Sequence, residues 1–343
     1  MERIAVAPNE SGFVCLPSGQ PFHPWGNNYG HAGMLVEDFW QTNWPALVED
    51  FAEMQRMGAN VVRVHLQFGK FMRDANELDP DALARLSRLL QLAESNSLYL
   101  DLTGLACYRK ADVPKWFDAL SEPGRWAAQA RFWAGVAAQC SKSPAVFCYD
   151  LINEPIAAAG QRKTGDWYTG ELGGLNFIQF INLDQAGRRR EKIAGDWVRL
   201  MCEAIHKQDR QHLITVGIIP PPKGWKTFSA FDPRELRSEL DFISVHIYPE
   251  SSGETDAIQL LRHFAVGKPV LIEETFPLSC PASELRTFLL DSRPWASGWI
   301  GHYNGESIAS LEALEKSGKI TPAQSAWLSW ERLFVELGPV MKK

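Results

Sequence analysis

The sequence predicts one α/β domain, built as a single (β/α)8 barrel. Eight short runs rich in strand-forming residues alternate with amphipathic helical stretches along the chain. No linker rich in Pro, Gly or Ser divides the 343 residues, and no shift in composition marks a boundary. Polar side chains gather where the predicted strands end, which is the end of a parallel barrel that carries its chemistry. We therefore expect one domain over residues 1–343.

Residues 1–21 are expected to form a short N-terminal β cap. The run 13–16 (Phe-Val-Cys-Leu) followed by the turn 17–20 (Pro-Ser-Gly-Gln) is typical of a hairpin. Beyond it, the eight core strands are expected at 22–30, 59–66, 98–103, 146–152, 212–217, 240–246, 269–274 and 298–303. The run 146–152 is almost continuously hydrophobic, as expected of a parallel strand that is buried on both faces.

Helical periodicity fills the intervals between these strands. Leu47, Phe51 and Met54 recur at helical spacing before Gly58, which ends the first helix. Asp79 is a suitable N-cap for the second helix, with Pro80 in its first turn. The expected helices cover 44–57, 80–95, 125–140, 189–208, 256–264, 283–290 and 321–337, with only a short helix within 228–239.

The segment 156–187 is too long for an ordinary connection between a strand and a helix. We expect it to lie over the active site as a long loop, either lining the substrate site or acting as a structural lid. Trp167 in this segment and Trp225 in the proline-rich loop 220–225 are candidate flat surfaces for sugar rings, although packing in the core explains most tryptophans equally well.

The composition limits the kinds of partner that the chain is expected to bind. The net charge is −6, from 35 basic and 41 acidic residues, which does not favour nucleic acid, and the triplet 188–190 (Arg-Arg-Arg) fits a solvated helix start. No apolar stretch is long enough for a membrane span, and no signal peptide precedes the first strand, so both a cytoplasmic and a processed secreted enzyme stay open. The six scattered cysteines are expected to be reduced thiols, with a disulfide as the alternative.

The polar strand ends form the candidate site. In a closed barrel they converge on one mouth, where two carboxylates, an arginine, a carboxamide and several aromatic residues meet. Cleavage of a glycosidic bond needs one carboxylic acid to protonate the leaving oxygen and one ionised carboxylate to attack or to activate water. The candidates are Asn28, Arg63, Thr103, Asn153, Glu154, His246, Tyr248, Glu274, His302 and Tyr303.

Four of these strand ends resemble glycoside hydrolase family 5, the cellulase and mannanase family. The matching segments are 59–63 (Ala-Asn-Val-Val-Arg), 153–155 (Asn-Glu-Pro), 246–248 (His-Ile-Tyr) and 268–274 (Lys-Pro-Val-Leu-Ile-Glu-Glu), in the expected order and on the expected strands. The resemblance extends over about residues 22–337. It implies a barrel enzyme that acts on oligosaccharides or polysaccharides without a metal or a cofactor.

The resemblance also implies roles for single residues. Glu154 would be the acid/base and Glu274 the nucleophile. Asn153 would bind the sugar 2-hydroxyl, Arg63 and Tyr248 would hold the nucleophile, and His246 would lie near the acid/base. Alternation along the strand would turn Glu273 outward, towards a helix or solvent, although near a strand end either glutamate could reach the site.

Two departures from the family pattern concern the substrate. Thr103 stands where the family usually has a histidine, and His302 and Tyr303 stand where it usually has a tryptophan, while Trp299 is expected to be core. The resemblance thus implies a retaining β-glycosidase, endo- or exo-acting on a β-linked glucan, mannan or related oligosaccharide. The alternatives are a catalytically silent barrel that binds carbohydrate and a transglycosylase of the same fold.

Overall fold

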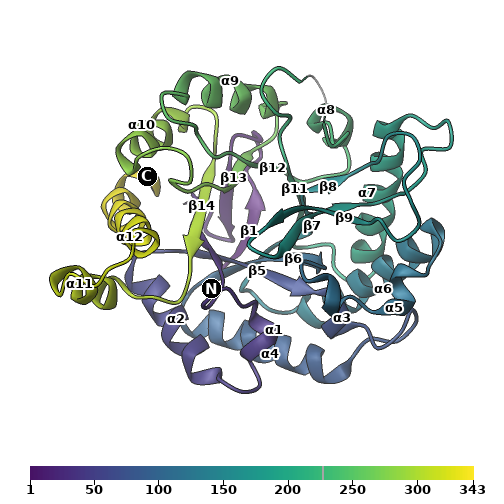
Figure 1. Ribbon diagram of the computed structural model, residues 1–343, viewed down its shortest axis with the longest axis horizontal. Helices are drawn as coiled ribbons and strands as arrows, with labels where there is room; N and C mark the ends of the chain where they lie inside the picture. Colours follow the sequence, from purple (N-terminus) through teal and green to yellow (C-terminus); the bar gives the residue numbers. More distant parts are fainter. Residues whose placement is uncertain (226–227) are drawn as a thin grey trace.

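The computed structural model describes residues 1–225 and 228–343 and shows a closed barrel of eight parallel strands (Figure 1). The strand runs are buried almost throughout, as their hydrophobic sequences require. In barrel order the strands are β4 (Trp25–Tyr29), β5 (Val61–Gln67), β6 (Tyr99–Ala106), β7 (Val146–Asn153), β11 (Leu213–Ile218), β12 (Ile243–His246), β13 (Val270–Glu274) and β14 (Gly298–Tyr303). The predicted (β/α)8 fold is confirmed.

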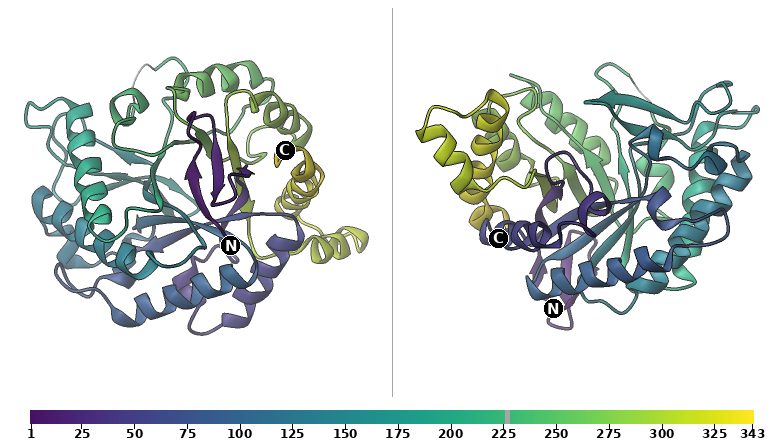
Figure 2. Two further views of the ribbon diagram at one scale, coloured as in Figure 1. Left: turned by 180° about the vertical axis from the view of Figure 1, so that it is seen from behind. Right: turned by 60° about the horizontal axis from the view of Figure 1, so that its bottom comes forward.

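Helices surround this barrel (Figures 1 and 2). Asp79 caps α4 as expected, accepting hydrogen bonds from the main-chain N–H groups of Asp81 and Ala82. The helices are α1 (Val36–Phe39), α2 (Trp44–Arg56), α3 (Phe68–Phe71), α4 (Pro80–Ser95), α5 (Lys115–Asp118), α6 (Glu122–Cys140), α7 (Arg190–His206), α8 (Pro233–Leu236), α9 (Glu254–Phe264), α10 (Ala282–Ser292), α11 (Ile308–Lys316) and α12 (Pro322–Met341), with a 3-10 turn at Lys110–Asp112. Within the described residues, none of these helices has the length and apolar character needed to cross a membrane.

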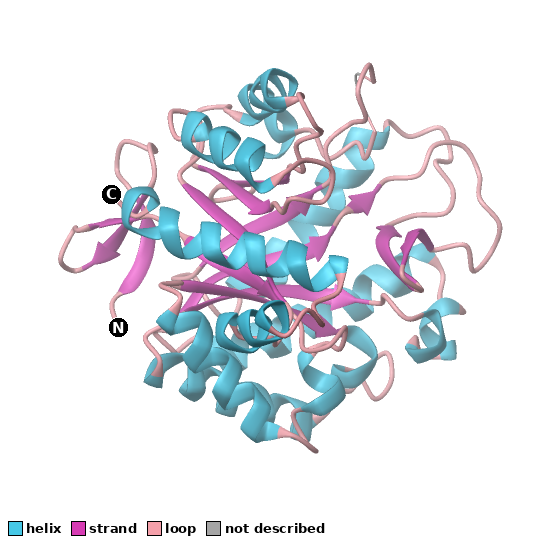
Figure 3. Ribbon diagram, turned by 60° about the vertical axis from the view of Figure 1, so that its left-hand side comes forward, coloured by secondary structure: helices cyan, strands magenta, loops and turns pink. Residues whose placement is uncertain are grey.

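The N-terminal segment closes the amino-terminal end of the barrel. It forms a three-stranded antiparallel sheet of β1 (Arg3–Val6), β2 (Phe13–Leu16) and β3 (Pro21–Phe22), which lies across the barrel when seen from behind (Figure 2). The ring of Phe13 lies 5.2 Å from that of Phe147 and 5.1 Å from that of Phe242. Aromatic packing therefore seals this end and leaves the opposite end for chemistry. Figure 3 shows the N-terminal strands and the long loops at opposite ends of the barrel.

The segment 156–187 is folded, contrary to the expectation of a loop. It continues from β8 (Pro155–Ile156) into a hairpin of β9 (Tyr168–Leu172) and β10 (Leu175–Phe180), which we call the mouth hairpin. Gly173 and Gly174 both have positive φ, as the tight turn of this hairpin requires. The N–H of Asn176 donates to the carbonyl of Tyr108 at 2.8 Å, and the side chain of Gln179 donates to the carbonyl of Leu105 at 2.8 Å. These bonds fix the hairpin to the barrel mouth.

The cysteines and Trp299 are placed as the sequence predicts. All six cysteines are free thiols, and five of them are buried. Trp299 is a core residue, 2% exposed, and its indole nitrogen donates to Ser292 Oγ at 2.8 Å.

Candidate active site

Two carboxylates meet at the carboxyl end of the barrel. Glu274 ends β13, and Glu154 directly follows β7. An oxygen of each lies within 4.8 Å of the other and of a ring nitrogen of His246. The backbone of Glu154 has a positive φ of 47°, and its N–H donates to the carbonyl of Gly217 at 2.9 Å. This hydrogen bond helps to hold a backbone conformation that is uncommon outside glycine.

The carboxylate of Glu274 is held by one cation and one hydroxyl. Arg63 Nη1 donates to Oε1 at 2.6 Å, and Tyr248 OH donates to Oε2 at 2.7 Å. Burial by itself raises the pKa of Glu274, but the charges of His246 and Arg63 outweigh burial and hold that pKa well below its usual value. Glu274 is therefore ionised and oriented in the unliganded protein, as a nucleophile must be.

Glu154 has a different neighbour. His246 Nδ1 lies 2.9 Å from Glu154 Oε1, so the two groups share a hydrogen bond. Burial lowers the pKa of His246, but Glu274 and the hydrogen bonds to Glu154 and Glu273 raise it to about 10. The side chain of Glu154 is 14% exposed and that of His246 is 1% exposed. Glu154 is thus the member of this pair that a molecule bound at the barrel mouth can contact.

The pKa of His246 predicts a pH dependence of stability. An unfolded histidine titrates near 6.5, so the raised pKa in the folded state stabilises the protein fully below that pH, and this contribution is lost as the pH rises towards 10. We expect the melting temperature of the wild type to fall more steeply between pH 7 and pH 10 than that of His246→Gln. Thermal melts of both proteins across this range measure the difference. Parallel curves would contradict the assignment of a cationic His246.

Arg63 lies at the centre of the site and is completely buried. Besides Glu274, it donates to Asn28 Oδ1 at 2.7 Å, Asp150 Oδ2 at 2.7 Å and Asn153 Oδ1 at 3.0 Å. Asn28 in turn donates to the carbonyls of Glu273 and Gly301, so both of its amide hydrogens are used within the protein. Asn28 lies at the site as predicted, but these bonds make it a support for Arg63.

Glu273 is the clearest departure from the expected geometry. The expectation that it faces outward is wrong, because its side chain is 0% exposed and lies inside the barrel, 3.5 Å from Arg63 Nη2 and 3.4 Å from His246 Nε2. The pairing of β12 with β13 shifts between Val245 and His246. This irregularity falls where Glu273 and Glu274 both turn towards Arg63, against simple alternation.

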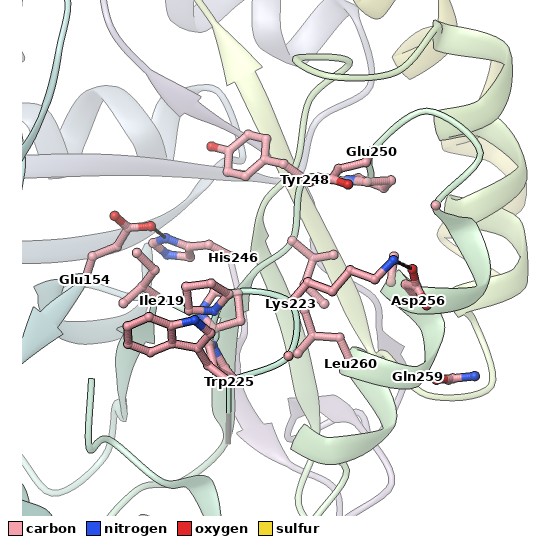
Figure 4. Close-up of a pocket in the computed structure, with 18 residues that line it drawn as sticks. Glu154, Ile219, Lys223, Trp225, His246, Tyr248, Glu250, Asp256, Gln259 and Leu260 are labelled. Carbon is pink, nitrogen blue, oxygen red and sulfur yellow. Dashed lines mark hydrogen bonds and ion pairs between the residues drawn. The ribbon is translucent and has the colours of Figure 1, made fainter. Parts of the chain in front are cut away.

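Two cavities open beside the carboxylates. The first, of about 440 Å³, touches both Glu154 and Glu274 and includes Asn153, Tyr248 and, at its edge, the mouth hairpin. The second, of about 550 Å³, touches Glu154, His246 and Tyr248 but not Glu274 (Figure 4). We call them the nucleophile cavity and the acid/base cavity, after the roles expected of Glu274 and Glu154. Of the two, only the nucleophile cavity is lined by both carboxylates.

The remaining predicted residues divide between these cavities and the core. His302 and Tyr303 line the nucleophile cavity, where His302 Nε2 lies 2.9 Å from Tyr248 OH. Trp225 lines the acid/base cavity together with Glu154 and His246 and is 62% exposed (Figure 4). Trp167 is placed elsewhere. It is 2% exposed and packs against the guanidinium of Arg125 at 4.0 Å, so its prediction as a sugar-binding residue does not fit the structure.

The structure adds site residues that the sequence pattern did not indicate. His65 lies two residues after Arg63 on β5 and lines the nucleophile cavity, and its Nδ1 lies 2.6 Å from Tyr108 OH. The alternation of strand side chains could have identified His65, since it shares the face of Arg63.

Thr103 is completely buried, and because β6 continues to Ala106, Tyr108 reaches the cavity in its place. Phe177 and Trp327 complete the apolar wall.

Two groups of acidic and histidine side chains have the spacing of metal ligands among the described residues: Glu154, His246 and Glu274, and Asp101, Asp150 and Glu273. Arg63 contacts members of both groups. A guanidinium already supplies positive charge there, so neither group resembles a metal centre with free ligands.

Comparison with protein families decides the classification. The model of the cellulase family, glycosyl hydrolase family 5, matches residues 17–275, which is most of the chain. The protein belongs to glycosyl hydrolase family 5. It is therefore a glycoside hydrolase, and the family match includes both carboxylates of the site. No curated protein matches the chain significantly.

Solved structures support the same fold for this family 5 member. The exo-β-1,4-mannosidase from Opitutaceae bacterium strain TAV5 is 18% identical with a TM-score of 0.67; the match covers 95% of this chain but only 61% of that longer chain. The endo-1,4-β-mannanase from Rhizomucor miehei is 17% identical, with a TM-score of 0.62 and coverage of 87% and 90%. A GH5_18 protein from Streptomyces cattleya, solved in complex with Manβ1-4GlcNAc, is 16% identical, with a TM-score of 0.63 and coverage of 81% and 70%.

Proposed function

We propose that this glycoside hydrolase is a retaining β-glycosidase, with Glu274 as nucleophile and Glu154 as acid/base. The observation that carries the proposal is the close approach of the two carboxylates, with oxygens within 4.8 Å. Retaining enzymes place their carboxyl groups about 5–5.5 Å apart, whereas inverting enzymes leave about 6.5–9.5 Å for a water molecule. The short separation supports double displacement.

In the first step, a Glu274 oxygen attacks the anomeric carbon while the bond to the leaving oxygen breaks. Glu154 gives its proton to that oxygen, and a glycosyl ester forms on Glu274. In the second step, Glu154 takes a proton from water, the water oxygen attacks the anomeric carbon, and Glu274 leaves as a carboxylate. Asn153 fits a contact with the 2-hydroxyl. Its Nδ2 donates one hydrogen to the carbonyl of Phe177 at 3.0 Å, which leaves the second hydrogen for a ligand.

The two cavities suggest how the substrate lies. The sugar that becomes attached to Glu274 occupies the nucleophile cavity, and the leaving group occupies the acid/base cavity, where Glu154 can reach its oxygen. Apart from the two catalytic glutamates and two histidines, the residues that line the nucleophile cavity are uncharged. This composition suits a neutral sugar. Because the similar structures include mannosidases and mannanases, β-1,4-mannosides are the first substrates to test.

Product stereochemistry tests the proposed function. The enzyme is mixed with β-1,4-mannobiose, Manβ1-4GlcNAc and the corresponding gluco- and xylo-disaccharides, and the first anomer released is observed by ¹H NMR. The proposal predicts that the β-anomer appears first with at least one of these substrates. First release of the α-anomer would show inversion and would remove Glu274 as a nucleophile. Binding without cleavage of any member would favour a silent barrel, and transfer to an added acceptor sugar would identify a transglycosylase.

Trp225 offers a prediction about the leaving group. Its exposed ring in the acid/base cavity can stack on a leaving sugar, and loss of an aromatic contact of this kind weakens binding by about 1 kcal/mol. We expect Trp225→Ala to raise KM for a cleaved disaccharide roughly fivefold with little change in kcat. Trp295→Ala is the matched control, because Trp295 is also partly exposed, at 37%, and lines neither cavity. Equal effects of the two substitutions would argue against a sugar platform at Trp225.

A further inference from the structure

A second set of carboxylates lies beneath the catalytic pair. Asp101, Asp150 and Glu273 are all completely buried, and oxygens of the three lie within 4.8 Å of one another. We call them the lower carboxylates. Glu154 and Glu274, whose side chains are 14% and 12% exposed, face the cavities above them. Buried charge is unfavourable unless it is paired, so the partners of the lower carboxylates decide what they do.

Two cations connect the lower carboxylates with the catalytic pair. Arg63 donates through Nη1 to Glu274 at 2.6 Å and through Nη2 to Asp150 at 2.7 Å. His246 faces Glu154 through Nδ1 at 2.9 Å and Glu273 through Nε2 at 3.4 Å. Each cation therefore divides its positive charge between a catalytic carboxylate and a lower one.

Gly217 on β11 makes this arrangement possible. A Cβ atom at this position would lie 2.8 Å from Glu273 Oε2, 2.9 Å from His246 Nε2 and 3.0 Å from Arg63 Nη2. The absent side chain leaves the space in which these three groups meet. The N–H of Gly217 also donates to Asp150 Oδ1 at 2.7 Å. The second oxygen of Asp150 is thereby directed at Arg63.

The division of charge has a consequence for the reaction. A carboxylate that is strongly stabilised by a cation is a weaker nucleophile but a better leaving group. We propose that Asp150 and Glu273 are positioning residues that draw part of the charge of Arg63 and His246 away from Glu274 and so keep it nucleophilic. This inference rests on the proposed function, because it concerns the formation and breakdown of the ester on Glu274.

The charges of the lower carboxylates fit this role. Burial and Glu273 raise the pKa of Asp150 to about 6, with Arg63 opposing them, so Asp150 is largely ionised at neutral pH. Burial also opposes ionisation of Glu273, but Arg63 and His246 outweigh it and lower its pKa. Asp101 differs, because burial and the charge of Glu273 raise its pKa well above the usual value. Asp101 also makes no hydrogen bond or ion pair with Arg63 or His246 among the described residues.

The two half-reactions can be measured separately with an activated 2-deoxy-2-fluoro β-glycoside. The rate of inactivation reports attack by Glu274, and the rate of reactivation reports breakdown of the ester. For Asp150→Asn we expect inactivation to slow roughly tenfold and reactivation to be at least as fast as in the wild type. A residue needed only for folding would slow both steps together. Equal slowing of both rates, or no change in either, would overturn the inference.

Asp101→Asn is the matched control, because Asp101 belongs to the same buried cluster but makes no hydrogen bond or ion pair with Arg63 or His246, and asparagine is isosteric with it. Both of its rates should stay within about twofold of the wild type. Glu273→Gln is the second test variant. Like Asp150→Asn, it should slow inactivation and leave reactivation at least as fast as in the wild type. If neither Asp150→Asn nor Glu273→Gln folds, the lower carboxylates are structural and the inference fails. If the wild type forms no adduct on Glu274, the proposed function itself fails, so the two failures are distinguishable.

Discussion

Replacement of Glu274 by alanine is expected to reduce kcat by roughly 10⁴-fold or more, because no other carboxylate in the site can take its place as the attacking group. The neighbouring Glu273 is enclosed below Arg63 and His246 and is 0% exposed, so it cannot reach a sugar in the cavity. Steady-state kinetics on an activated aryl glycoside measure the loss. Circular dichroism establishes that the variant is folded.

Azide provides the control for Glu274→Ala. In the space left by the carboxylate, azide can attack the anomeric carbon directly from the face that Glu274 occupied. A single displacement then gives the α-glycosyl azide, while the wild type gives none. Activity of Glu274→Ala close to that of the wild type would remove Glu274 from the mechanism. A folded variant without activity or rescue would indicate that Glu274 only orients other groups.

Replacement of Glu154 by alanine is expected to affect substrates according to their leaving groups. A sugar leaving group needs a proton, and loss of general acid catalysis lowers kcat/KM by about 10²–10⁴-fold. A dinitrophenyl leaving group departs with little help, so its kcat/KM should fall by less than roughly tenfold. The comparison of a disaccharide with a dinitrophenyl glycoside of the same sugar measures the difference. Equal losses for both substrates would contradict the role of acid.

The base role of Glu154 can be tested with the same variant. Without a base, water reacts slowly with the ester on Glu274, and glycosyl-enzyme accumulates with the dinitrophenyl substrate. Azide needs no base and attacks from the face that water would use, which gives the β-glycosyl azide. The anomers from Glu154→Ala and Glu274→Ala should therefore be opposite, which provides an internal check on both assignments.

The barrel could be predicted from the sequence because its signals are local. Buried parallel strands produce hydrophobic runs, and each run between Trp25 and Tyr303 stands out from the amphipathic helices beside it. The positions of Glu154, Arg63 and Tyr248 follow from the same reasoning. Each lies on a barrel strand or within two residues of its carboxyl end, and the carboxyl ends of all these parallel strands lie at the same end of the barrel.

What the sequence did not reveal depends on contacts between distant segments. Glu273 turns inward at an irregular pairing of β12 with β13, which no local pattern records. Trp167 is buried against the guanidinium of Arg125, which lies 42 positions earlier in the chain. The segment 156–187 forms a hairpin whose anchors, the carbonyls of Leu105 and Tyr108, lie on another unit of the barrel. In each case, tertiary contacts determine where the side chain or segment lies.

Covalent labelling with activated 2-deoxy-2-fluoro β-glycosides of the manno, gluco, xylo and cellobiosyl series can identify the nucleophile directly. Intact mass reports the stoichiometry, and peptide mapping locates the adduct. We expect one sugar per chain, attached to Glu274, and the series that reacts identifies the preferred sugar. An adduct on Glu273 or another residue, or hydrolysis of an active substrate without any adduct, would contradict the role of Glu274 as nucleophile.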